Sequence, residues 1–512
     1  MILTPEQSAA VTHPGGPALV LAGAGAGKTR VLCHRLAWLI DNRVAPDEVL
    51  ALTFTREAAV ELRQRAEHEI GRSHETLRVS TFHSYAQDLV RVHGVERGLL
   101  PPCEVARPED RALLLLERLG ELDLRLHDLR GDVAGLVNDI IGRIDACRDE
   151  LVPAAGYRAW AEAAVADAGS RAVEHRMRRE LEFARIYEAH DRWLAEAGLE
   201  DFGLWIMRAL ELLRTHPDRL EAVRAGARHV LVDEFQDTNH AQAELLYLVA
   251  GAADSLMVVG DDDQGIYRFR GASAKNITDF RSRFPGCAEL RLELNHRSGQ
   301  EILDAAAAVV APLPDRAPKH LIALPHAPGG RPRFWTARDP EAQARAVVAE
   351  IRRQADAGVP LEEQAILMRA VRREARPLVQ ARERAGVPHQ VRGGVGLLER
   401  REVRAAIAWL RAATDPSDAR AHLRIAAARR WGLPWRAVAD AVAEAAPGAV
   451  TGALCGVARD AGAEEFLDTL ESVGRAAAEE TPTDALRIAI DRSGVRSAAL
   501  ATGGAEGASR LA

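Results

Sequence analysis

A lysine at the end of a glycine-rich loop is the first residue of this chain whose type and position could do chemistry. The loop and the turn that follows it read Ala22, Gly23, Ala24, Gly25, Ala26, Gly27, Lys28, Thr29 and Arg30. An apolar run precedes the loop and a helical pattern follows it, which is the context of a phosphate-binding Walker A loop. Glycines let backbone N–H groups turn towards phosphate oxygens, and a helix N-terminus favours an anion. We expect Lys28 to reach the β- and γ-phosphates of a nucleotide and Thr29 to bind Mg²⁺; a glycine-rich turn without a ligand is the alternative.

The rarity of lysine strengthens this interpretation. Lys28, Lys275 and Lys319 are the only lysines among the 67 basic residues, and the others are arginine. A lysine placed in such a loop is therefore not explained by the composition of the chain.

Two adjacent carboxylates form the second part of the expected site. Asp233 and Glu234 follow the apolar run Val230–Val232. Ligands of open α/β sheets lie at the carboxyl ends of the strands, so both side chains should face the same edge as the glycine-rich loop. We expect Asp233 to complete the Mg²⁺ sphere through water and Glu234 to act as the general base on the attacking water.

Apolar runs that alternate with helical patterns position these residues. The runs are residues 18–22, 49–54, 77–81, 229–233 and 255–260, and the best helical patterns between them are 29–40 and 56–70. Such alternation predicts a parallel α/β sheet. Residues 89–227 are rich in Ala, Leu, Arg and Glu at helical spacing and predict a helical insertion. Residues 331–391 return to an α/β pattern, with 364–368 as its best strand.

Composition excludes several classes of protein. The chain has 512 residues, 47% hydrophobic and 28% charged, with a net charge of −7. It is long enough for about three domains, and any DNA site must be a local patch. It has no apolar run long enough to span a membrane and no signal peptide, so we expect a cytoplasmic protein. The five cysteines are too far apart in sequence to suggest a zinc site or a disulfide framework.

Several segments together resemble the UvrD/Rep/PcrA-like superfamily 1 DNA helicases. The most specific is Asp233–Asn239, which resembles motif II of that family. The others, in family order, are Leu3–Gln7 (Q motif), Thr53–Ala59 (motif Ia), Ser80–Ser84 (motif Ib), Val259–Ala272 (motif III) and Leu294–Ser298 (motif IV). The resemblance runs from residue 3 to about residue 430.

The resemblance implies further nucleotide contacts. Gln7 would bond the adenine edge, and Gln264 would sense the γ-phosphate and link it to the DNA side. Arg297 would contact the γ-phosphate, for which a permanently charged, planar guanidinium is suited; a core arginine with a surface ion pair is the alternative. His296 stands where the family usually has a tyrosine that stacks on adenine.

The resemblance also implies a site for single-stranded DNA. Its residues are Phe54, Thr81, Phe82, His83, Tyr267, Phe269 and Arg270. Stacking of bases on aromatic rings tolerates any base sequence, which suits a motor that steps along DNA. The alternatives are that the aromatic residues belong to the core and that His83 caps a helix.

The expected fold is α/β: a P-loop NTPase (RecA-like) core with helical insertions and a partial second RecA-like domain. The predicted domains are 1–88 and 228–293 (first motor domain), 89–227 (helical insertion), 294–390 (second motor domain, first part) and 391–512 (second helical insertion). Motifs V and VI of the family are not found in the sequence. We therefore expect a C-terminally incomplete member that binds nucleotide better than it hydrolyses it.

The predicted function is an ATP-dependent, 3′–5′ DNA helicase or translocase that acts in repair or replication. Its expected ligands are ATP, Mg²⁺, single-stranded DNA and junctions between single- and double-stranded DNA. Its expected protein partners are repair proteins, and its expected location is the bacterial nucleoid. The alternatives are an ATP-gated DNA-binding or regulatory module without motor activity, and the motor fragment of a helicase–nuclease.

Overall fold

The apolar run before the glycine-rich loop forms a strand at the centre of a parallel sheet. The computed structural model describes residues 3–98, 104–127, 133–266, 276–313, 316–392, 401–446 and 448–497. The sheet has six parallel strands in the order β3-β2-β6-β7-β1-β8. These are β1 (Gly16–Ala22), β2 (Val49–Thr53), β3 (Arg78–Thr81), β6 (His229–Val232), β7 (Ser255–Gly260) and β8 (Ala288–Leu292). The order brings β6 and β1, which lead to the acidic pair and to the loop, to either side of β7.

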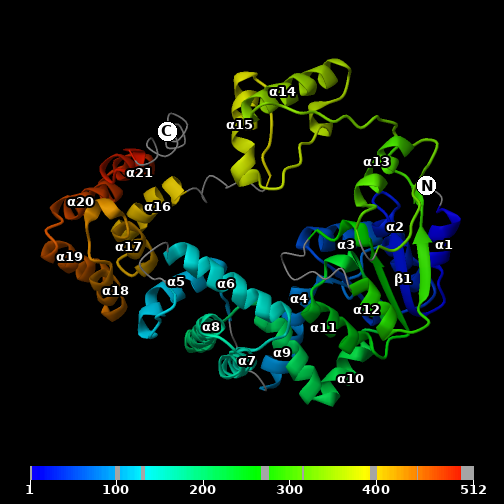
Figure 1. Ribbon diagram of the computed structural model, residues 1–512, viewed down its shortest axis with the longest axis horizontal. Coiled ribbons are helices and arrows are strands. Elements are labelled where there is room, and N and C mark those ends of the chain that lie inside the picture. The colour runs from blue at the N-terminus through cyan, green and yellow to red at the C-terminus, as the bar shows by residue number, and fades with distance from the viewer. Residues whose placement is uncertain are drawn as a thin grey trace. The chain divides into compact units, whose positions relative to one another are not determined.

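Both faces of this sheet are covered by helices (Figure 1). Leu19 and Leu21 of β1 pack into one apolar core, and Val20 and Ala22 pack into the other, as the two-residue period of a strand requires. Helices α4 (Phe82–Leu89), α9 (Phe202–Thr215), α10 (Pro217–Ala225), α11 (His240–Ala250) and α12 (Asn276–Arg283) contribute to the first core. Helices α1 (Pro5–Val11), α2 (Lys28–Asp41) and α3 (Arg56–Ile70) contribute to the second.

A helical body is inserted between β3 and β6. Its helices are α5 (Pro108–Arg118), α6 (Val133–Asp149), α7 (Ala154–Ala166) and α8 (Arg171–Glu196), which share an apolar core around Phe183 and Trp193. Two short parallel strands, β4 (Glu104–Val105) and β5 (Leu199–Glu200), lie where the chain enters and leaves this body. This body has its own core but is shorter than the predicted insertion 89–227, because α9 and α10 of that segment pack in the first core of the sheet.

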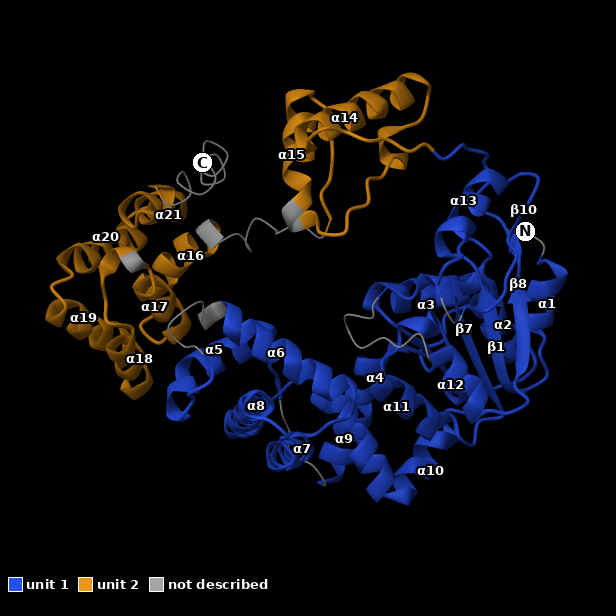
Figure 2. Ribbon diagram, in the orientation of Figure 1, with its two compact units in different colours: residues 1–332 blue, residues 333–512 orange. Residues whose placement is uncertain are grey.

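A second, shorter parallel pair follows the sheet. Strands β9 (Leu294–Asn295) and β10 (Ile322–Ala323) are joined through α13 (Gln300–Val310). This β–α–β unit belongs to the first of two compact units, which comprise residues 1–332 and 333–512 (Figure 2).

The described residues of the second unit form helices joined by loops, without a strand. Helices α14 (Pro340–Asp356) and α15 (Val371–Arg384) pack through Ala344, Val348, Ile351 and Leu378. The others are α16 (Arg401–Thr414), α17 (Ala419–Ala426), α18 (Trp435–Glu444), α19 (Val450–Asp460), α20 (Glu464–Glu479) and α21 (Pro482–Arg492). The rings of Trp409, Trp431 and Phe466 pack together among them, with centroids 5.4 to 5.5 Å apart.

One predicted strand is wrong. Residues 364–368 form neither a strand nor a helix, and Leu367 is 95% exposed. A β-strand exists through hydrogen bonds to a neighbour, and no described strand lies beside this segment. The strands predicted in the first unit are confirmed, β7 at the predicted residues, and so is the α/β class with a parallel central sheet.

The expectations about membrane spans and about cysteines can also be compared with the described residues. None of their helices has the length and apolar character needed to cross a membrane. Cys33, Cys147, Cys287 and Cys455 are free thiols, and Cys103 lies outside the described residues.

Candidate nucleotide-binding and catalytic site

The glycine-rich loop takes a conformation that requires glycine at two positions. Gly25 and Gly27 have φ angles of +80° and +91°, in the left-handed region that only glycine enters freely. A Cβ atom at Gly27 would also lie 2.7 Å from Nε2 of Gln7. Gly27 is the N-cap of α2, so the backbone N–H groups of the loop are adjacent to the positive end of that helix.

The loop and the acidic pair meet, as the sequence predicted. Nζ of Lys28 donates to Oε2 of Glu234 at 2.6 Å, and the hydroxyl of Thr29 lies 3.5 Å from Oδ2 of Asp233. Lys28 is buried, and Glu234 is about one-third exposed (34% of its side chain). Residues more than 200 positions apart in sequence therefore present an ammonium group, a hydroxyl and two carboxylates at one point.

Glu234 has an unusual backbone conformation. Its φ and ψ angles are both 48°, which is left-handed and uncommon for a residue with a side chain. Such strain costs on the order of 1–3 kcal/mol and concentrates at functional sites. Here it turns the chain directly after β6, so that consecutive carboxylates reach Lys28 and Thr29.

Burial controls the protonation of the acidic residues. It raises the pKa of Asp233 to about 6, with a further contribution from Glu234, while Lys28 and hydrogen bonds from the Glu234 amide and Thr29 oppose the shift. Burial and then Glu234 also raise the pKa of Asp237 to about 6. At the end of β6, the ammonium group of Lys28 is the cation that lies against these carboxylates, in an ion pair with Glu234.

Gln7 links the start of the chain to the loop. Its side chain donates to the carbonyl of Ala26 at 3.0 Å, lies 3.2 Å from Nε2 of His296, and forms a capping box with Thr4. Burial, followed by the charges of Arg30 and His326, lowers the pKa of His296. Gln7 and His296, which the resemblance assigns to adenine, therefore lie side by side at one end of the loop.

The segment that resembles motif IV packs directly on the loop. The amide of Asn295 donates to the carbonyl of Ala24 at 2.5 Å, and the backbone N–H of His296 donates to the carbonyl of Gly25 at 3.0 Å. Arg297 is exposed, and its Cβ would lie 2.7 Å from a Cβ added at Gly25. Because Arg297 is an exposed residue beside the loop, the alternative of a core arginine is wrong.

Gln264 is connected to Glu234 through two side chains. Its amide donates to Oδ2 of Asp261 at 2.5 Å. The backbone N–H of Asp261 donates to Oε1 of Gln236 at 2.9 Å, and Nε2 of Gln236 donates to Oε2 of Glu234 at 2.8 Å. The side chains that end β6 and β7 thus form one hydrogen-bonded chain.

The residues expected to bind DNA differ in their surroundings, and three of them lie outside the described residues. Phe54 is half-buried and lines a cavity of about 270 Å³ together with Glu234 and Gln264. Thr81 caps α4 by accepting from the N–H of Ser84 at 3.2 Å. Residues Tyr267, Phe269 and Arg270 lie outside the described residues.

The structure corrects two interpretations of this segment. Phe82 is 1% exposed in the first core of the sheet, so its ring is enclosed and cannot stack on a base. His83 does not cap α4, because Thr81 does; its ring is nearly perpendicular to that of Phe202, with centroids 6.2 Å apart. Burial lowers the pKa of His83, so the ring is neutral at pH 7.

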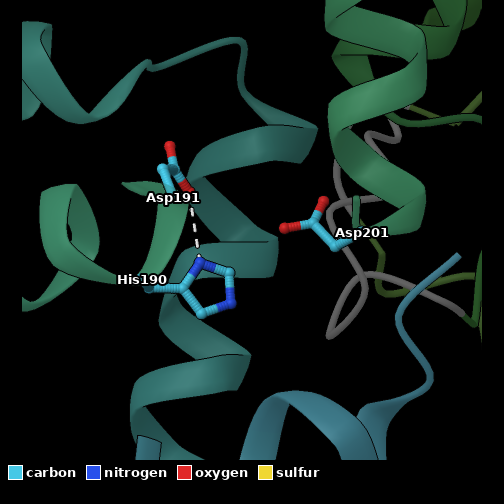
Figure 3. A group of neighbouring side chains, drawn as sticks. All are labelled: His190, Asp191 and Asp201. Atoms are coloured by element: carbon cyan, nitrogen blue, oxygen red, sulfur yellow. Dashed lines mark hydrogen bonds and ion pairs between the residues drawn. The ribbon is translucent and has the colours of Figure 1, made fainter. Parts of the chain in front are cut away.

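A second group of titratable residues, in the helical insertion, has the composition of a metal site. His190, Asp191 and Asp201 lie close together, with Nδ1 of His190 3.1 Å from Asp191 (Figure 3). However, Arg148 donates to Asp191 at 2.5 Å and to Asp201 at 3.3 Å, and Arg111 donates to Nε2 of His190 at 3.1 Å. Both carboxylates and both ring nitrogens therefore already have partners, and the group is a buried ion-pair network.

The charges of this network stabilise the ionised carboxylate. Burial alone would raise the pKa of Asp201, but the charges of Arg148 and Arg111 outweigh it and lower the pKa below its ordinary value. The network joins α5, α6, α8 and the start of α9.

A parallel sheet in which a glycine-rich loop joins the first strand to a helix, with an acidic pair at the end of another strand, is the fold of the P-loop nucleoside triphosphatases. Comparison with known sequences defines the group more narrowly. The UvrD/REP helicase N-terminal domain matches residues 3–285, and the UvrD-like helicase C-terminal domain matches residues 290–447. The chain belongs to the UvrD/REP helicase family.

Individual relatives agree. The chain is 34% identical to DNA helicase II of Escherichia coli over 424 residues, which cover 83% of this chain and 56% of the relative. It is 32% identical to ATP-dependent DNA helicase PcrA of Staphylococcus epidermidis over 419 residues, covering 81% and 54%. It is 35% identical to ATP-dependent DNA helicase UvrD1 of Mycobacterium tuberculosis over 451 residues, covering 85% and 56%. The matches thus cover a little over half the length of these relatives.

Sequence reasoning missed four residues of the site. Gln236 and Asp261 connect Glu234 to Gln264, and Asn295 holds the loop. Lys319 contacts the carboxylates that follow β7. For Lys319 a signal was present, because it is one of only three lysines.

Proposed function

We propose that this chain is the ATP-binding and DNA-binding part of an ATP-dependent DNA helicase. The observation that carries the proposal is the meeting of Lys28, Thr29, Asp233 and Glu234 at the carboxyl edge of a parallel sheet. Membership of the UvrD/REP helicase family supports DNA as the substrate.

The pairing of Lys28 with Glu234 suggests how nucleotide binding prepares the base. The phosphates of ATP are competing acceptors for the ammonium group of Lys28. When Lys28 turns to them, Glu234 loses its cation and becomes available to accept a proton from the attacking water. Gln236 keeps Glu234 oriented through its hydrogen bond of 2.8 Å.

The oxygens at this point fit a magnesium ion. The hydroxyl of Thr29 and a carboxylate oxygen of Asp233 are 3.5 Å apart, and both are hard oxygen ligands of the kind Mg²⁺ takes beside phosphates. The chemistry that Mg²⁺ supplies there is neutralisation of charge on the phosphate oxygens. Gln7 and His296 would hold the base of the nucleotide, and Arg297 would reach the γ-phosphate.

Single-stranded DNA would pass the end of the sheet marked by Phe54. Phe54 and Gln264 line the same cavity as Glu234, which supports a direct connection between bound DNA and the proposed general base, Glu234. Tyr267, Phe269 and Arg270 complete the proposed DNA site, with Thr81 and His83 beside it. The 3′–5′ polarity, binding to single-strand/double-strand junctions, repair partners and location at the nucleoid remain part of the proposal and rest on family resemblance.

The domain organisation is proposed on the same basis. We propose a first motor domain formed by 1–88 and 228–293, a helical insertion 89–227, the first part of a second motor domain at 294–390 and a second insertion from 391. The βαβ unit of β9, α13 and β10 would be the start of the second motor domain.

Phosphate release from ATP, measured with and without a single-stranded oligonucleotide, tests the proposal. We expect nucleotide to bind, and DNA to stimulate hydrolysis. Tight ATP binding with no turnover under either condition would instead indicate an ATP-gated binding module. Failure to bind nucleotide at all would refute the proposal.

A further inference from the structure

A buried lysine forms ion pairs with three consecutive carboxylates beside the proposed catalytic site. Asp261, Asp262 and Asp263 follow β7, and Nζ of Lys319 forms ion pairs with all three, at 3.0 Å from Asp263. The side chain of Lys319 is 5% exposed. The guanidinium of Arg316 donates two hydrogen bonds to the carboxylate of Asp263, at 2.7 and 2.8 Å.

These cations come from the β–α–β unit that also holds the phosphate loop. Residues 316–320 lie between α13 and β10, and β10 pairs with β9. Asn295, at the end of β9, donates to the carbonyl of Ala24 in the loop. One short unit therefore contacts the phosphate loop through Asn295 and the acidic cluster through Lys319.

Asp261 connects Lys319 to the proposed general base, Glu234. Its carboxylate pairs with Lys319 and accepts from Gln264, and its backbone N–H donates to Gln236, which in turn donates to Glu234. A movement of Asp261 would therefore disturb both Gln264 and Glu234.

The carboxylates need the lysine to remain charged and in place. Asp261 is 3% exposed and directly precedes Asp262 and Asp263 in the chain. Burial alone would lower the pKa of Lys319, but the charges of Asp261 and Asp262 and their hydrogen bonds raise it, so the lysine is charged at pH 7. Without this cation the carboxylates would repel one another, and Asp261 would move or take up a proton.

We propose that Lys319 is a positioning residue that couples the nucleotide site to the DNA site by holding Asp261, and through it Gln264 and Gln236, in place. This inference rests on the proposed function. It assigns Lys319 no contact with nucleotide or DNA. Loss of Lys319 should therefore leave the affinity for nucleotide alone and the affinity for DNA alone nearly unchanged. It should abolish the effect of one ligand on the binding of the other.

The test measures the dissociation constant of a labelled oligothymidylate with and without Mg²⁺ and a non-hydrolysable ATP analogue. The ratio of the two constants is the coupling, and we expect it to differ from one by about fivefold or more in the wild-type chain. In Lys319→Met the ratio should fall to within about twofold of one, while the affinities for DNA alone and for the analogue alone change by less than about threefold. Lys319→Arg keeps the charge and should restore most of the coupling.

Arg316→Met is the matched control. It removes one positive charge from the same cluster, but Arg316 contacts Asp263 and not Asp261, so most of the coupling should remain. An equal loss in Arg316→Met and Lys319→Met would show that only the net charge matters and would overturn the inference.

Other outcomes separate this inference from the proposed function. Wild-type coupling in Lys319→Met, or nucleotide and DNA binding without coupling in the wild type, would overturn the role of Lys319 alone. Failure of the wild type to bind nucleotide would refute the proposed function and this inference with it. If Lys319→Met does not fold, Lys319→Met combined with Asp262→Asn restores the charge balance while Asp261 still lacks its cation, and the same loss of coupling is expected.

Discussion

Replacing Glu234 by glutamine separates the two roles that the structure gives to this carboxylate. Glu234 is the acceptor of the Lys28 ammonium group at 2.6 Å and the proposed general base. The glutamine oxygen can still accept from the charged Lys28, so the substitution removes only the attraction between opposite charges and weakens the pair by about 1 kcal/mol. The weakening is this small because Glu234 is one-third exposed, and water screens the attraction.

Lys28 must leave Glu234 to bind phosphate, so the weaker pair favours nucleotide binding. About 1 kcal/mol corresponds to an affinity about fivefold tighter for the Glu234→Gln chain. Turnover should fall by about 10²–10⁴-fold, because the amide cannot accept the proton of the attacking water.

Titration with a fluorescent ATP analogue and measurement of phosphate release would give both quantities for the same preparation. Asp237→Asn is a suitable control, because it removes a nearby carboxylate that has no ion pair with Lys28 among the described residues. Its nucleotide affinity should change less than that of Glu234→Gln. Weaker nucleotide binding by Glu234→Gln would refute the competition between Glu234 and phosphate, and unchanged turnover would refute its role as the base.

Three other substitutions test separate parts of the structure. Lys28→Ala should abolish nucleotide binding in the same titration, and retained affinity would refute the phosphate-loop assignment. Arg148→Met should destabilise the chain by ~3–5 kcal/mol, because Asp191 and Asp201 lose their shared cation, which is buried; an unchanged thermal unfolding midpoint would contradict this. Burial, with Asp145 and Glu150 adding to it, raises the pKa of Asp149 to about 7, so the folded chain holds this proton more tightly than the unfolded chain and stability falls as pH rises from about 4 to 7. Asp149→Asn should therefore stabilise the chain more at pH ~8 than at pH ~5, and the difference between the two gains in unfolding free energy should be at most ~4 kcal/mol. Thermal unfolding at both pH values measures this, and equal gains would contradict the raised pKa.

Local sequence patterns were sufficient to predict the sheet strands named above and the glycine-rich loop and acidic pair that follow two of them. Strand β7 and helix α3 have the predicted bounds, because β7 is a continuous apolar run between two aspartates and α3 has helical spacing between its cap Thr55 and Gly71. The glycine-rich loop and the acidic pair could be predicted for a similar reason, since each directly follows a strand. Parallel strands then bring both to the same edge.

Interactions between distant residues could not be predicted in this way. Segment 364–368 has the composition of a strand but no described neighbour with which to pair. Phe82 is enclosed by helices that begin more than a hundred residues later, and Lys319 contacts its carboxylates 56 to 58 positions away in sequence. The types of these residues were visible in the sequence, whereas their surroundings depend on the fold.

The two-residue strands β4 and β5 have a consequence for how such a chain can diversify. The backbone N–H of Glu104 donates to Gly198 at 2.9 Å, and that of Ala106 donates to Glu200 at 2.8 Å, so the points where the chain enters and leaves the α5–α8 body are fastened together. The two strands are parallel, so the chain between them must cross over, and the α5–α8 body is that crossover connection. Evolution can therefore lengthen, shorten or exchange this body as a unit, while the ends that it presents to the sheet stay in register.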